Sequence, residues 1–403
     1  MAGVTDDPGS IARSHGERVA SIVLSLREWV LGQPRGPGAG EAPFTRVGRG
    51  SRRPRALVAG LLAALAGCGI EPAGPRATVL HGRAMGTTWQ VTLADTALPA
   101  ERAQLERIVR EELELVERQM STWRPDSDLS LFNGSATVQP VEIRPELAHV
   151  VGHALAVAQQ TDGAFDITVA PLVDLWGFGP AVREHRPPHE ELLAAARKQV
   201  GYRRLRLLDA GTDHPQLQKL QPGVRLDLSA LAKGYGIDLV AAALDRAGRR
   251  NYLIELGGEL RARGRSPRGG AWRVGLELPS SQHVGLVRRT IPLADAAVAT
   301  SGTYRQNFSE AGHPGHLFSH IIDPRTGRPV EHGAVSVSTI GATAMEADAL
   351  ATALLVMGAD SGLPWAEARG LAATFVVRSA DGLREVATPA FERFADSSPP
   401  ADR

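Results

Sequence analysis

The sequence predicts an α+β fold. Helical and strand patterns do not alternate regularly along the chain, which argues against a doubly wound parallel sheet. Helical patterns dominate up to residue 248, and strand patterns dominate from residue 251 onward. The chain also contains 43 glycines and 27 prolines, so many turns between short elements are expected.

The first elements are expected to be two strands followed by two helices. Residues 77–94 read as two strands around Gly86. Residues 101–123 carry apolar side chains at helical spacing with charges between them, which predicts a helix with one buried face. Those apolar positions are Leu105, Ile108, Val109, Leu113, Val116 and Met120. A second helix is predicted from Pro145, a residue type favoured in the first turn, to Thr161.

Shorter patterns predict the remaining elements. We expect a helix near 188–199, a strand at 205–208, a hairpin turned at Pro222-Gly223, and a helix that has Ser229 as its N-cap and stops at Gly248. Further strands are predicted at 251–256, 271–278, 286–293, 318–322, 335–341 and 373–377. One long helix, from Thr343 to Met357, precedes the last strand.

The composition is that of an ordinary globular protein. Hydrophobic residues make up 43% and charged residues 22% of the 403 residues. The net charge of +1 gives no electrostatic case for nucleic-acid binding, which calls for a basic face. We therefore expect no nucleic-acid partner.

The N-terminal region carries the signals of a bacterial lipoprotein. Several arginines precede an apolar run at 56–67, which is too short for a membrane-spanning helix but suits a signal peptide. The run ends in "LAGC", which resembles a lipobox, so Cys68 is expected to be acylated and to become the first mature residue. The alternative for this single cysteine is a lone buried thiol. The lipoprotein interpretation predicts a protein anchored to a membrane of the cell envelope, on its periplasmic or extracytoplasmic side.

These signals divide the chain. We expect residues 1–48 to be a disordered or wrongly assigned extension, 49–67 the signal peptide, and 68–78 a linker. Residues 79–395 are the expected folded domain, and 396–403 a disordered tail.

A carboxylate and a hydroxyl share one face of the long C-terminal helix. Asp348 and Thr352 are four residues apart, and their oxygens are hard donors suited to Mg²⁺ or Ca²⁺. The alternative is that Asp348 faces solvent. Its neighbours are nearly all small or apolar, however, so the carboxylate is expected to be buried and to need a partner.

The segment "LDLSALAKGYGID" combines a helix start with a cation. Free N–H groups there and Lys233 one turn later favour an anion, although an ordinary amphipathic helix also fits. Gly234 and Gly236 allow a close approach by another backbone or a ligand. Neither GxGxxG after a strand nor GxxxxGK[ST] occurs, so the two familiar nucleotide-binding loops are not predicted. Trp123 and Phe165 are candidates to stack on a flat ring, or to lie in the core.

Together, these segments resemble the ApbE family of FAD:protein FMN transferases. The motifs are "MGTTW", "MSTWRPDSDLSLFN", "GAFDITVAPLV", "LDLSALAKGYGID", "LIELGGELRARG", "ATSGTYRQNF", "SHIIDPRTGRP" and "EADALATAL". The resemblance covers about residues 78–395. It implies a fold of mixed and antiparallel sheets with packed helices, related to the T-fold, with the FAD site between two subdomains.

The resemblance also implies site residues. By motif, the FAD contacts would be Met85, Trp123, Ala164, Phe165, Asp166, Asp227, Lys233 and the backbone of Ile322. The Mg²⁺ ligands would be Asp348, Thr352 and the carbonyl of Ala230. Trp123 stands where tyrosine is frequent, which keeps a stacking face, and Ala230 stands where Gly or Thr can occur.

The implied reaction is cleavage of FAD and attachment of FMN, through a phosphoester, to a Thr or Ser of a flavoprotein from a membrane electron-transfer system. We assign His320 as the general base for the acceptor hydroxyl, because a neutral imidazole near pH 7 suits that role and the Pro-rich turn after it is rigid. Asp323 is expected to hold this turn. The alternatives are hydrolysis of FAD to FMN and AMP, a non-catalytic flavin-binding lipoprotein, and self-modification at "IGATA", which we interpret as structural.

Overall fold

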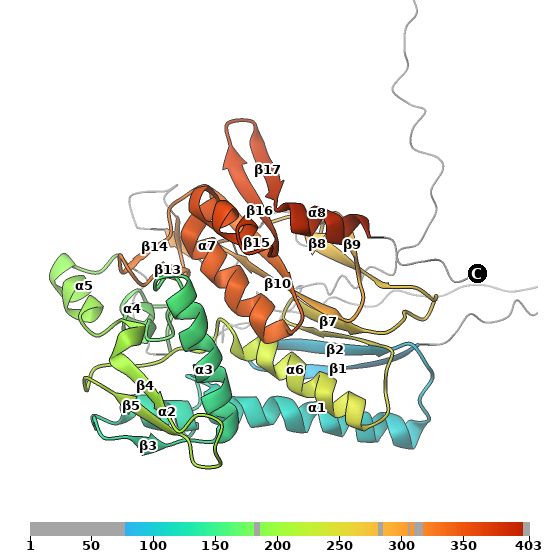
Figure 1. Ribbon diagram of the computed structural model, residues 1–403, viewed down its shortest axis with the longest axis horizontal. Helices are drawn as coiled ribbons and strands as arrows, with labels where there is room; N and C mark the ends of the chain where they lie inside the picture. The colour runs from blue at the N-terminus through green and yellow to red at the C-terminus, as the bar shows by residue number, and fades with distance from the viewer. Residues whose placement is uncertain (1–76, 181–185, 281–284, 305–306, 310–316, 398–403) are drawn as a thin grey trace, which may run out of the picture. The chain divides into compact units, whose positions relative to one another are not determined.

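An antiparallel sheet forms the centre of the fold (Figure 1). The computed structural model describes residues 77–180, 186–280, 285–304, 307–309 and 317–397. Within these residues the main sheet has eight strands in the order β1-β2-β6-β7-β10-β15-β16-β17. The bounds are β1 Thr78–Ala84, β2 Thr87–Leu93, β6 Tyr252–Leu256, β7 Glu259–Arg263, β10 Ala296–Gly302, β15 Ala334–Gly341, β16 Ala372–Ser379 and β17 Gly382–Ala387. The predicted α+β class is confirmed.

The two faces of the main sheet are covered differently because side chains alternate along a strand. Ile254 and Ala297 pack with helices α1 (Pro99–Met120) and α6 (Ala232–Arg246). Their neighbours Leu253 and Val298 pack on the other face with the hairpin β8 (Trp272–Glu277)–β9 (Val287–Leu293) and helix α8 (Pro389–Asp396). The sheet therefore lies between a layer of helices and a layer formed by this hairpin and α8.

Helix α7 (Ala344–Glu367) packs against β10, β15 and β16. Its helical conformation is interrupted at Gly358, whose φ is 72° and ψ is 171°. The sequence-predicted end at Met357 coincides with this break. Within the described residues, α7 alone has the length and apolar composition of a membrane span, a test that the core helix of a globular protein also passes.

A smaller helical part is built around α3 (Pro145–Gln160), and its core also includes residues of α1, α6 and α7. Its remaining elements are α2 Asp128–Gly134, α4 Ala170–Leu175, α5 Glu190–Arg197, the 3₁₀ turn Tyr202–Arg204, and the sheet β3 (Val141–Glu142)-β5 (Gln216–Lys219)-β4 (Leu205–Leu208). The predicted helices at 101–123, 145–161 and 188–199 are confirmed as α1, α3 and α5.

Three local predictions are wrong. The expected strand 318–322 is two short strands, β12 (Leu317–Ser319) and β13 (Ile322–Asp323), because the chain leaves the ladder at His320. They pair with β11 (Asn307–Ser309) and β14 (Arg328–Pro329) respectively.

The hairpin at Pro222-Gly223 does not form, because the side-chain amide of Asn133 binds the backbone of Leu226 in place of a strand. Asn133 Oδ1 accepts a 2.7 Å bond from Leu226 N, and Asn133 Nδ2 donates a 2.8 Å bond to the Leu226 carbonyl. Ser229 is not an N-cap, and α6 begins at Ala232. Asp227 Oδ1 instead accepts a 2.8 Å hydrogen bond from Ser229 N, which holds this stretch in a turn. The predictions for residues 1–67 and for Cys68 lie outside the described residues.

Candidate active site

One cavity of about 390 Å³ gathers most of the sequence-predicted site residues. It lies between α7 and the ends of β7 and β10 on one side, and the segments 122–123 and 164–179 on the other. The predicted residues that line it are Trp123, Ala164, Phe165, Asp166, Asp227, Ala230, Lys233, His320, Ile322, Asp348 and Thr352. Met85 is not among the lining residues and lies in the turn between β1 and β2.

Asp348 and Thr352 face this cavity from consecutive turns of α7, and Asp348 is only 3% exposed. The solvent-facing alternative for Asp348 is therefore wrong. Two groups fix the start of the helix. Thr343 Oγ1 accepts a 3.2 Å bond from Glu346 N, and the carboxylate of Asp238 accepts bonds of 2.9 Å from the N–H groups of Ala344 and Met345. Thr343, the hydroxyl of "IGATA", thus acts as an N-cap.

Helices α6 and α7 meet at Gly234. A Cβ added there would lie 2.3 Å from the carbonyl oxygen of Ala344, so only glycine allows this approach. Gly234 N donates a 3.2 Å hydrogen bond to Asp348 Oδ2. Burial raises the pKa of the Asp348 carboxyl, and the charge of Lys233 opposes that shift. The cavity therefore holds a carboxylate whose charge is costly without a cation.

Lys233 supplies positive charge to the wall of the same cavity, and it directly precedes Gly234, whose N–H binds Asp348. Its Nζ lies 3.2 Å from Glu259 Oε1 and 3.3 Å from the carbonyl of Ser229. The side chain of Glu259 is almost fully buried, and it lies at the start of β7. Sequence reasoning missed Glu259, although it lies within the quoted motif "LIELGGELRARG".

Hydroxyl groups at the end of β10 also reach the cavity. Thr300, Ser301 and Gly302 line it, and Ser301 Oγ lies 2.9 Å from Thr352 Oγ1. Sequence reasoning missed these residues as well, although "ATSGTYRQNF" contains them. The hydrogen bond to Ser301 holds the Thr352 hydroxyl oxygen in position in the cavity wall.

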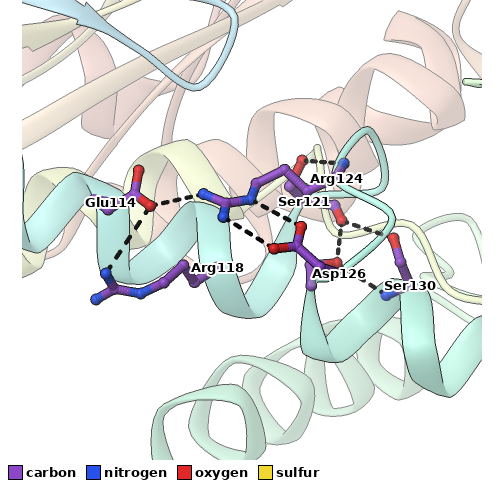
Figure 2. A network of polar contacts seen from close by, with 7 residues as sticks. Glu114, Arg118, Ser121, Arg124, Asp126 and Ser130 are labelled. Carbon is purple, nitrogen blue, oxygen red and sulfur yellow. Dashed lines mark hydrogen bonds and ion pairs between the residues drawn. The ribbon is translucent and has the colours of Figure 1, made fainter.

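Trp123 and Phe165 differ in what they can do. Trp123 is 68% exposed, whereas Phe165 is 3% exposed and belongs to the core around α3. Ser121 Oγ accepts a 3.2 Å bond from Trp123 N, and Figure 2 shows Arg124 held between Glu114 and Asp126 next to it. A firmly held loop therefore carries Trp123, which lines the cavity with a largely exposed indole of the kind that can stack on a planar ring.

The carboxylates of Asp166 and Asp227 accept hydrogen bonds from backbone N–H groups. Asp166 accepts bonds from Thr168 N at 2.8 Å and Tyr202 N at 2.6 Å, and burial raises its pKa while these hydrogen bonds oppose the shift. Asp227 is half-buried and leaves one oxygen, Oδ2, beyond its bond to Ser229 N.

His320 lies between β12 and β13, with its ring edge-on to Phe178 at 6.2 Å between centroids. The turn after it is held by Asp323, whose carboxylate accepts from Arg325 N at 2.9 Å and pairs with the Arg325 guanidinium at 2.9 Å. This agrees with the structural role expected for Asp323. The ring therefore stands at a fixed place in the cavity wall, next to a rigid turn.

Residues 85–375 match the ApbE family. The chain belongs to the ApbE family. It is 40% identical over 330 residues to the FAD:protein FMN transferase of Vibrio cholerae, covering 82% of this chain and 95% of the relative. It is 36% identical over 348 residues to the FAD:protein FMN transferase of Haemophilus influenzae, covering 85% and 99%.

Solved structures of ApbE proteins have the same fold. The flavin transferase ApbE from Vibrio cholerae aligns with a TM-score of 0.71 and 38% identity, covering 79% of this chain and all of the other. The Pseudomonas stutzeri flavinyl transferase ApbE aligns with a TM-score of 0.72 and 34% identity, covering 82% and 100%. The resemblance found from the motifs is confirmed, and the chain is a transferase enzyme.

The oxygen donors of this ApbE-family site fit Mg²⁺. No cluster of three or more His, Cys, Asp or Glu suited to a metal occurs in the described ranges. Asp348, Thr352 and Ala230 nevertheless line the same cavity, with one buried carboxylate, one hydroxyl and one backbone carbonyl. This is the set expected for a cation that is held by one or two carboxylates and completed by substrate phosphates and water.

Proposed function

We propose that this enzyme cleaves FAD and attaches FMN, through a phosphoester bond, to a Thr or Ser hydroxyl of an acceptor flavoprotein, with release of AMP. The supporting observation is the convergence in one cavity of a buried carboxylate-hydroxyl pair, a lysine, an exposed indole face and a histidine. The names of the relatives support FAD as the flavin substrate.

The acidic and basic residues of the cavity have different roles in cleavage of the pyrophosphate. Asp348, Thr352 and the Ala230 carbonyl would hold Mg²⁺, which supplies Lewis-acid stabilisation of the charge that develops on the phosphate oxygens. Lys233 places an ammonium group in the same wall, where it stabilises negative charge on phosphate. Glu259 and the Ser229 carbonyl keep that ammonium in position. Positioning and electrostatics account for most of the catalysis of phosphoryl transfer.

His320 would act on the acceptor hydroxyl. The hydroxyl oxygen forms a new bond to the FMN phosphorus, and its proton passes to the imidazole. The P–O bond to the AMP half breaks, and its electron pair leaves with the AMP phosphate. The fixed turn at Pro324 holds the ring where the acceptor must arrive, while Trp123 offers a face for the isoalloxazine ring.

Asp348→Asn is the sharpest test, because it removes one charge without changing size. We expect FAD cleavage and covalent flavin on the acceptor to fall together to background, with circular dichroism unchanged. Asp360→Asn is the matched control, since Asp360 lies exposed on the same helix. Full transfer by Asp348→Asn in the presence of EDTA would rule out the metal site. Release of free FMN and AMP without a protein adduct by the unmodified enzyme would favour hydrolysis instead.

We also propose that acylation of Cys68 anchors the enzyme to a membrane on its extracytoplasmic side, near acceptors of membrane electron-transfer systems. The support is the basic, apolar and "LAGC" sequence that ends at the single cysteine. Cys68→Ser should release the protein from the membrane fraction and remove its lipid. A Cys68→Ser protein that still carries lipid would contradict this assignment.

A further inference from the structure

A strongly basic hollow lies beside the active-site cavity. It measures about 560 Å³, and Arg197, Lys198, Arg204 and Arg325 supply its cations. We call these four residues and the space between them the basic hollow. Asp166 and Pro324 line both the basic hollow and the cavity, so the two spaces share a wall.

The positive charge of the basic hollow is poorly balanced. Arg325 pairs with Asp323 at 2.9 Å. In the part of the chain that the structure describes, Arg197, Lys198 and Arg204 make no ion pair with a carboxylate. The carboxylate of Asp166 does not compensate them, because it is buried and bonded to Thr168 and Tyr202.

The end of α5 explains only part of this cluster. Cations at a helix C-terminus are stabilised by the helix dipole, which accounts for Arg197 and Lys198. Arg204 comes from the 3₁₀ turn before β4, and Arg325 from the turn after β13. Three separate segments therefore direct cations at one space, an arrangement that the dipole of α5 does not require.

The basic hollow is held rigidly relative to His320. The guanidinium of Arg197 donates a 2.7 Å bond to the carbonyl of Arg325, and Trp176 Nε1 donates a 2.9 Å bond to the carbonyl of Gly327. A Cβ at Gly327 would lie 2.7 Å from Arg197 Cγ, so α5 and the turn are in close contact. Figure 1 shows α5 next to the β13–β14 hairpin. Pro324 follows His320 by four residues and lies in the turn between β13 and β14.

We propose that the basic hollow docks an acidic segment of the acceptor protein and so delivers the acceptor hydroxyl to His320. This inference rests on the proposed function. A Thr or Ser side chain carries no charge to guide it, whereas complementary charge beside the site raises the encounter rate and fixes the register of a bound segment. The hollow is charged opposite to such a segment, rigid, and adjacent to the cavity wall where the hydroxyl must react.

Binding of a fluorescein-labelled oligo-aspartate peptide tests the docking surface without catalysis. We expect wild-type binding to weaken about tenfold in Arg197→Glu/Lys198→Glu, and about threefold in Lys198→Glu alone, because each exposed charge contributes modestly. Arg206→Glu/Arg384→Glu is the matched control, since it reverses two exposed charges elsewhere. Equal loss in the control, or no binding by wild type, would overturn the proposal.

Flavin transfer separates this proposal from the proposed function. With membranes from a strain that lacks the enzyme as the acceptor source, Lys198→Glu should raise the KM for acceptor at least threefold and leave the KM for FAD unchanged. An unchanged acceptor KM would overturn the docking surface while the transferase assignment stands. A raised KM for FAD would assign the hollow to the nucleotide instead. No transfer by wild type would overturn the proposed function itself.

Discussion

Substitution of Gly234 by alanine tests whether the contact between α6 and α7 positions the site. The new Cβ would lie 2.3 Å from the Ala344 oxygen and 2.7 Å from Met345 Cα, which are backbone atoms of the first turn of α7. An ordinary contact begins at 3.4 Å, so one helix must move by about 1 Å. That movement would also stretch the bond from Gly234 N to Asp348 Oδ2, which is 3.2 Å long.

The expected cost is set by two opposing effects. Overpacking of this kind costs up to about 3 kcal/mol, because backbone cannot move aside as a side-chain end can. Alanine returns up to about 1 kcal/mol through its higher helix propensity. The free energy of unfolding should therefore fall by about 2 kcal/mol.

Gly236→Ala is the matched control on the same helix. Its Cβ would meet Leu113 Cδ2 at 3.1 Å and Met85 Sδ at 3.4 Å, both flexible side-chain ends. Its unfolding free energy should change by less than about 1 kcal/mol. Urea unfolding of both variants, with Mg²⁺-dependent FAD cleavage measured on each, decides the matter. A Gly234→Ala protein as stable and active as Gly236→Ala would refute the reasoning.

Three further predictions follow from single side chains. Thr352→Ala should reduce FAD cleavage less than Asp348→Asn does, because water can replace a neutral ligand; an equal loss in steady-state kinetics would contradict this. His320→Asn should bind FAD normally in equilibrium titration yet lose transfer by roughly 10²–10⁴-fold, and a parallel loss of FAD affinity would make it a binding residue. Burial lowers the pKa of Lys219 to about 8 from an ordinary value of 10.5. The unfolded chain then binds more protons at Lys219 over that interval, so the unfolding free energy of wild type relative to Lys219→Met should rise from pH 8 to 10.5, and an unchanged difference would contradict this.

Long amphipathic helices were predictable because burial of one helix face makes apolar residues recur every three or four positions in the sequence. The buried residues of α1, including Leu105, Val109 and Leu113, are those that the spacing selects. The break at Gly358 was also indicated, since the apolar run ends at Met357 and is followed by the sequence GADSG. The Asp348–Thr352 pair could be found for a related reason, because the residues around Asp348 are nearly all small or apolar.

The missed residues lie on elements whose sequences look unlike strands. β10 reads AAVATSG, with small side chains and little alternation, because α7 packs directly on it through Ala299, Ala347 and Ala351. Ser301 therefore went unassigned until the fold placed it against Thr352. Glu259 was not singled out from the sequence, and only its tertiary contact with Lys233 shows why a carboxylate is buried there.

The shape of the site also depends on long-range contacts that no local pattern reports. Asn133 is 93 residues from Leu226, yet its amide replaces a strand partner there and thereby defines the loop that carries Asp227 and Ala230. Asp238 caps α7 from another helix, more than 100 residues earlier in the chain. The sequence identified the chemical groups of the site, whereas such contacts determine how they face one another.

We propose that FMN passes from FAD to a protein hydroxyl in a Mg²⁺-dependent reaction. The most direct measurement incubates the enzyme with FAD, Mg²⁺ and membranes from a strain that lacks it, followed by in-gel flavin fluorescence and peptide mass spectrometry. We expect a fluorescent band, a Thr or Ser peptide heavier by FMN less one water, AMP in equal amount, and loss of all three in EDTA. Consumption of FAD to free FMN and AMP with no modified peptide, or a modified peptide formed equally well in EDTA, would contradict it.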